Sequence, residues 1–83
     1  ALQELDRAYS TMRSNYLRFL AAEDDVRLRE PRYLLGEELV DSILRAYERR
    51  ADAEITYYRS VVDYNKAIAM LELRRGTLMA YNN

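Results

Sequence analysis

The chain has 83 residues, with two glycines, one proline, no cysteine, no histidine and a formal net charge of −1. Without cysteine and histidine it lacks disulfides, thiolate metal ligands and the commonest general base. We therefore expect no enzyme, with no catalytic residue, metal site or cofactor. Acidic and basic residues are interleaved, which argues against nucleic-acid binding, and no apolar run approaches the ~20 residues of a membrane-spanning helix. The first residue is Ala1 rather than Met, so we expect a mature or excised segment.

The first predicted element is a helix over about residues 2–33. Large residues recur there at alternating spacings of three and four, the heptad pattern of a coiled coil. Pro31 has no backbone N–H and clashes with the preceding helical turn. The helix therefore either kinks at Pro31 and reaches Tyr33, which the unbroken heptad phase favours, or ends near Arg29. The heptad row consists of Leu2, Leu5, Tyr9, Met12, Tyr16, Phe19, Glu23, Val26, Glu30 and Tyr33.

A turn at Gly36 follows, and the sequence favours a positive φ there. Acidic residues such as Glu37 and Glu38 are favourable close to a helix N-terminus. A second helix is predicted over about residues 38–75. Gly76 is its expected C′ residue, and residues 76–83 are expected to form an exit tail.

The second helix carries two apolar rows, whereas one partner helix covers one. Two long helices around a single turn predict an all-α fold, a long antiparallel coiled-coil hairpin. The surplus apolar surface predicts packing on a third element, by self-association or inside a larger helical barrel or bundle. One row is Val40, Leu44, Tyr47, Ala51, Tyr58, Val62, Asn65 and Ala69, and the other is Tyr57, Val61, Tyr64, Ile68, Leu71 and Leu78. The residues expected to pack helices are Tyr9, Tyr16, Phe19, Val26, Leu44, Tyr47, Tyr58, Val61, Tyr64 and Ile68.

From about Ala21 to Asn83 the chain resembles the TolC-like outer membrane efflux proteins. The order of several short pieces, more than any one of them, carries this resemblance. They are the turn Arg32-Tyr33-Leu34-Leu35-Gly36-Glu37-Glu38, the opening of the second helix Leu39-Val40-Asp41-Ser42-Ile43-Leu44-Arg45-Ala46, then Tyr57-Tyr58, Asp63-Tyr64-Asn65, Ala67-Ile68, Arg75-Gly76-Thr77-Leu78 and Tyr81-Asn82.

The resemblance implies one hairpin of the periplasmic α-helical barrel of a trimeric outer membrane efflux channel. The chain would be the periplasmic portion of an outer membrane protein, without a membrane span of its own. Its partners would be the other protomers of the trimer and a periplasmic adaptor protein that meets the turn. The residues implied to contact the adaptor are Tyr33, Leu34, Leu35, Gly36, Glu37 and Glu38.

The chain also departs from the family pattern. Glu38 stands where relatives can carry a basic residue, and Ser42 and Arg45 stand where some carry acidic residues. These substitutions argue against a ring of carboxylates that binds cations. Without the family resemblance, the sequence leaves two possibilities for Leu34 and Leu35. These apolar residues either fold back onto the hairpin or dock a partner. A second interpretation also stays open, a free-standing coiled-coil hairpin that self-associates as an interaction scaffold.

Overall fold

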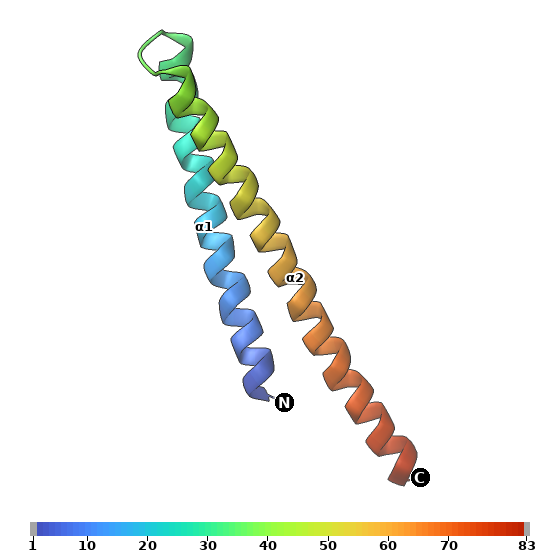
Figure 1. Cartoon of the computed structure of the whole chain (residues 1–83). Helices are drawn as coiled ribbons and strands as arrows, with labels where there is room; N and C mark the ends of the chain where they lie inside the picture. The colour runs from blue at the N-terminus through green and yellow to red at the C-terminus, as the bar shows by residue number, and fades with distance from the viewer. Residues whose placement is uncertain (1, 83) are drawn as a thin grey trace.

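The structure, a computed structural model, is a hairpin of two long antiparallel helices (Figure 1). It describes the backbone of residues 2–82 and the side chains of residues 3–76. Helix α1 spans Leu2–Leu34 and helix α2 spans Val40–Asn82. The molecule measures 70 × 14 × 14 Å. The predicted all-α hairpin is therefore confirmed, and the described residues contain no strand.

Helix α1 continues through Pro31 to Leu34, so the alternative in which it ends near Arg29 is wrong. The N–H of Leu35 donates to the carbonyl of Pro31 at 3.1 Å, which keeps the helical pattern beyond the proline. The missing N–H of Pro31 removes one bond, to the carbonyl of Arg27. Both residues are exposed and lie near the helix end. Water can therefore replace that bond, which makes the proline tolerable there.

The turn after α1 is a Schellman motif centred on Gly36. The N–H of Glu37 donates to the carbonyl of Arg32 at 2.8 Å, and the N–H of Gly36 donates to the carbonyl of Tyr33 at 3.0 Å. Gly36 has a φ of +77°, a conformation that strains residues with a Cβ. The predicted turn at Gly36 is confirmed.

Both predicted ends of the second helix are wrong. The helix begins at Val40 rather than at residue 38, because the carbonyl of Leu39 accepts its first bonds, from Ser42 and Ile43. It also continues through Gly76 to Asn82 instead of ending at Arg75. Gly76 has no positive φ. A helical glycine costs only about 1 kcal/mol relative to alanine, so Gly76 does not stop the helix. Of the predicted tail, Asn83 lies outside the described residues.

Small side chains form the centre of the contact between the helices. Ala46, Ala53 and Ser60 recur every seven residues on α2 and are buried, together with Ile43 and, on α1, Val26. The hydroxyl of Ser60 donates to the carbonyl of Tyr57 at 2.6 Å, so this buried polar group is satisfied. Small residues at the contact let two helices approach closely.

The close approach moves part of the predicted heptad row of α1 to the margin. Tyr9, Tyr16 and Glu30 are exposed. A second row with seven-residue spacing, Ala8, Asn15 and Ala22, is half-buried instead. Tyr9 and Tyr16 lie at the edge of the contact, where their rings pack against Tyr64 and Tyr57 of α2.

Candidate interaction surfaces at the tip and along helix α2

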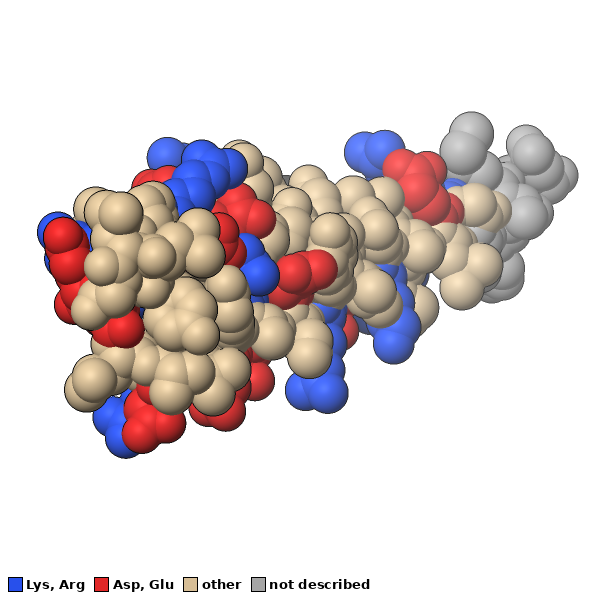
Figure 2. Space-filling view, turned by 90° about the horizontal axis from the view of Figure 1, so that it is seen from above, with Lys and Arg blue, Asp and Glu red and all other residues tan. Residues whose placement is uncertain are grey.

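The tip of the hairpin, residues 33–39, is largely exposed and apolar. Leu34 is 82% exposed, Leu35 74% and Leu39 78%. Figure 2 looks down onto this end and shows uncharged surface in its middle with charged side chains around it. Leu34 and Leu35 therefore do not fold back onto the hairpin. The sequence did not indicate Leu39 as part of the tip, because the second helix was expected to begin at about residue 38 and so to include it.

A network of polar side chains lies where the two helices meet the turn. Arg29 donates to the Asp25 carboxylate at 2.9 Å, to Glu38 at 2.5 Å and to the hydroxyl of Ser42 at 2.8 Å. The hydroxyl of Ser42 in turn donates to Glu38 at 2.5 Å. Glu38 thus points back into the hairpin, with only 13% of its side chain exposed, while Tyr33, Leu34, Leu35, Gly36 and Glu37 are exposed. The structure separates Glu38 from the other five residues implied to contact an adaptor.

The same network shifts the acidity of its carboxyl groups. The hydrogen bond from Arg29 lowers the pKa of Asp25, and Arg49 contributes in the same direction. The hydrogen bond from Ser42, followed by the bond and charge of Arg29, lowers the pKa of Glu38. Each carboxylate is therefore stabilised in its ionised form in the folded hairpin.

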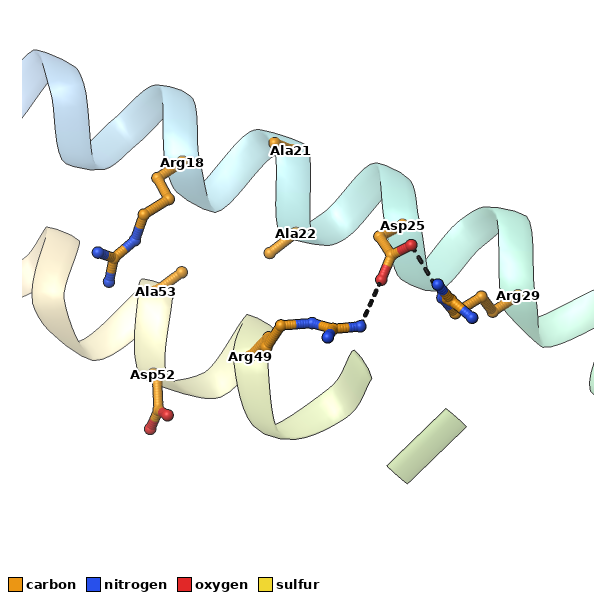
Figure 3. A pocket seen from close by; sticks show the side chains of 8 residues that line it. All are labelled: Arg18, Ala21, Ala22, Asp25, Arg29, Arg49, Asp52 and Ala53. Atoms are coloured by element: carbon orange, nitrogen blue, oxygen red, sulfur yellow. Dashed lines mark hydrogen bonds and ion pairs between the residues drawn. The ribbon is translucent and has the colours of Figure 1, made fainter. Parts of the chain in front are cut away.

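Asp25 also joins the two helices. Arg49 of α2 donates to its second oxygen at 3.2 Å, and Figure 3 shows the carboxylate between Arg49 and Arg29. Tyr47 of α2 donates to Glu30 of α1 at 2.9 Å on an exposed edge. These bonds join the first three turns of α2 to α1 close to the tip. The shallow groove beside Asp25 is lined by Arg18, Ala21, Ala22, Asp25, Arg29, Arg49, Asp52 and Ala53.

Aromatic side chains join the helices along one margin. The ring of Tyr9 packs against Tyr64 with centroids 5.8 Å apart. Tyr57 contacts Tyr16 at 5.3 Å and Phe19 at 6.1 Å. These rings combine apolar packing with hydroxyls that reach water at the margin, as tyrosine commonly does.

A second apolar surface lies on the outside of α2. We name it the outer row, and its residues recur at spacings of three and four. The largest are about half exposed: Ile55 53%, Tyr58 56% and Val62 50%. At ~100° per residue this row lies roughly 150° around the helix from the buried alanines. The outer row consists of Ala51, Ile55, Tyr58, Val62, Asn65 and Ala69.

The residues expected to pack helices therefore divide into two groups. Phe19, Val26, Tyr47, Val61, Tyr64 and Ile68 are buried or half-buried between α1 and α2, and Tyr9 and Tyr16 pack at the margin. Leu44 and Tyr58 do not belong to that contact and are exposed on α2. Tyr58 belongs to the outer row, and Leu44 lies on the same face of α2. Their heptad spacing marks them as apolar positions but does not say which side of α2 meets α1.

Residues 2–82 contain no group of three or more histidine, cysteine, aspartate or glutamate side chains that could hold a metal ion. Neither helix, over its described residues, is long and apolar enough to cross a membrane. In comparisons with known proteins, no family model, no curated protein and no solved structure matches the chain.

Proposed function

We propose that the chain is an interaction element, one hairpin of the periplasmic α-barrel of a TolC-like outer membrane efflux channel. In this proposal its tip contacts a periplasmic adaptor protein and its outer face packs on neighbouring helices of a trimer. The resemblance of residues 21–83 to that family supports the proposal. The proposed function involves no catalytic step, cofactor or metal.

The exposed leucines of the tip carry the proposal. Burying Leu34, Leu35 and Leu39 against a partner would remove from water apolar area that is now 74–82% exposed. Apolar burial contributes about 25 cal/mol per Å². The hydrogen bonds among Arg29, Glu38 and Ser42 join the turn to both helices, which reduces the conformational entropy that the turn would lose when a partner binds.

A photo-crosslinking experiment tests the tip. Leu35 is replaced by a photoreactive phenylalanine analogue, and the purified chain is irradiated with the helical hairpin of a periplasmic adaptor. Ser14, an exposed position of α1 far from the tip, receives the same analogue as a control. We expect a covalent product from position 35 and none from position 14. Equal products from both positions, or none from either, would contradict the proposed contact.

The gene that encodes the chain provides an independent test of the channel. A channel of this type requires a second related hairpin and ~10-residue strands with alternating apolar residues for its membrane barrel. Sequencing the reading frame on both sides of these codons would reveal them. A reading frame that encodes neither would refute the channel and leave the tip contact to be judged by crosslinking alone.

The outer row favours a second candidate function, that of a self-associating scaffold. Half-exposed Ile55, Tyr58 and Val62 form an apolar surface that a partner helix would cover. A scaffold needs only copies of this hairpin, whereas a channel needs other helices of a longer protein.

A further inference from the structure

The outer row has the arrangement of a coiled-coil seam. Ile55, Val62 and Ala69 are seven residues apart, and Ala51, Tyr58 and Asn65, also seven apart, occupy the complementary heptad positions. Glu48 and Glu72 occupy the next positions at the two ends. Because a glutamate is unfavourable in the apolar centre of a coiled coil, the seam that a second helix could cover is limited to residues 51–69.

Four charged side chains flank this seam, Asp52, Glu54, Arg59 and Lys66, and two of opposite sign, Glu54 and Arg59, lie five residues apart. Glu54 and Arg59 are both exposed, and neither makes a hydrogen bond or ion pair with any residue among 3–76, whose side chains the structure describes. Arg50, one helical turn before Glu54, lies over the ring of Tyr47 instead, 5.2 Å from its centroid. Both charges are therefore available to another chain.

We propose that the outer row binds a second copy of the chain, as a parallel, in-register α2–α2′ coiled coil. In that arrangement Ile55 faces Ile55 and Val62 faces Val62 of the other copy. Glu54 then lies beside Arg59 of the other copy on both sides of the seam, since these flanking positions, five residues apart, meet in parallel coiled coils. Both tips point the same way, and each α1 lies on the outside of the pair.

The antiparallel registers that keep the apolar residues together are less favourable. One places Arg45 opposite Lys66 of the other copy, and the next pairs Asp52 with Lys66 but places Arg59 opposite its own equivalent. Like charges at such positions destabilise a coiled coil and select against that orientation. In the parallel register Glu54 of each copy pairs with Arg59 of the other, which gives two attractive pairs. No like charges meet at the flanking positions over residues 51–69.

This inference goes beyond the proposed contact with an adaptor and does not depend on it. The tip and the outer row involve different residues, so a crosslink at position 35 and a pairing along α2 succeed or fail separately.

Disulfide trapping tests the pairing directly, because the chain contains no cysteine of its own. The variants Ile55→Cys and Val62→Cys are oxidised mildly and run on non-reducing gels. Equivalent core positions of a parallel pair lie close enough for a disulfide. We expect each single variant to give a covalent dimer and the exposed control Ser14→Cys to give none. Dimers that form only from a mixture of Ile55→Cys and Tyr58→Cys would show an antiparallel pair and overturn the proposal, as would no dimer at all.

Charge reversal tests the register. Glu54→Arg should weaken dimerisation roughly tenfold, because two attractive pairs become repulsive. The double variant Glu54→Arg with Arg59→Glu should restore it. Sedimentation equilibrium measures the dissociation constants, and circular dichroism checks that the helices of each variant are intact. Equal dimerisation of the single variant and the unmodified chain would overturn the parallel register.

Discussion

At the scale of single residues, the two glycines occupy different backbone conformations. Gly36 has a φ of +77°, and Gly76 lies inside α2. Apart from its neighbours in the chain and the adjacent helix backbone, a Cβ added at either glycine would meet no described atom within 4 Å. Substitution therefore changes only backbone energetics, and the two positions form a matched pair.

We expect Gly36→Ala to lower the free energy of unfolding by about 1 kcal/mol, because alanine is strained at positive φ. Gly76→Ala should raise it by about 0.5–1 kcal/mol, since alanine favours the helix. Urea unfolding at one fixed protein concentration measures both. A Gly36→Ala variant as stable as the unmodified chain would contradict the left-handed conformation.

The lowered pKa of Glu38 makes part of the stability depend on pH. A carboxyl whose pKa is lower in the folded state stabilises that state above its ordinary value, which for Glu38 is 4.5. This stabilisation is lost as the pH falls from there through the lowered pKa. Arg29 and Ser42 then face a neutral acid.

We therefore expect Glu38→Gln to be less stable than the unmodified chain at pH 7 and to differ little from it near pH 2. Urea unfolding at the two pH values measures the change. Glu37→Gln is the matched control, because Glu37 is exposed and lies one residue away. If both variants behaved alike at pH 7, the bonds of Glu38 would contribute nothing to folding.

At the scale of the helices, the heptad spacing predicts two helices but leaves open which side of each faces the other. Buried Ala46, Ala53 and Ser60 decide this, because a row of small residues permits close approach. The larger Ile55, Tyr58 and Val62 are left outside. When a helix has two apolar faces, the spacing of its apolar residues does not predict which face is buried. The size of the side chains on each face decides this.

We expect Ala53→Leu to destabilise the hairpin by about 1–3 kcal/mol, because Ala53 is only 3% exposed at the contact between the helices and a larger side chain there strains their packing. Ala21→Leu on exposed α1 surface should change the free energy of unfolding by less than about 0.5 kcal/mol. Thermal unfolding followed by circular dichroism compares the two. Similar melting temperatures would mean that Ala53 is not closely packed.

At the scale of the whole molecule, a 70 Å rod only 14 Å wide buries few side chains completely. A single pair of helices has too little interior to cover both faces of α2. Association with another helix would supply the missing contacts. The stability of the hairpin should therefore depend on how much of it is associated.

We expect the melting temperature to rise with protein concentration, because association stabilises the folded state. Ile55→Glu should abolish that dependence by placing a charge in the outer row. Ser14→Glu, on exposed surface of α1, should retain it. Calorimetry over a wide range of concentrations makes the comparison. A melting temperature independent of concentration in the unmodified chain would contradict self-association.

The candidate tip could be predicted only in part. Gly36 and the neighbouring leucines follow from local sequence, since a turn between long helices needs the glycine. The inward orientation of Glu38 could not be predicted, because Arg29 and Ser42 come together only after the turn has formed. Leu39 joins the exposed surface because α2 begins at Val40, later than its charge pattern indicates.

The sequence by itself determined two helices, their antiparallel order and the turn at Gly36. Heptad spacing and glycine conformation are local properties that need no distant contact. Tertiary structure alone decided which apolar row is buried and that Glu38 folds back. These depend on the fit of side-chain volumes and charges between residues far apart in the chain. That fit exists only once α1 and α2 lie side by side.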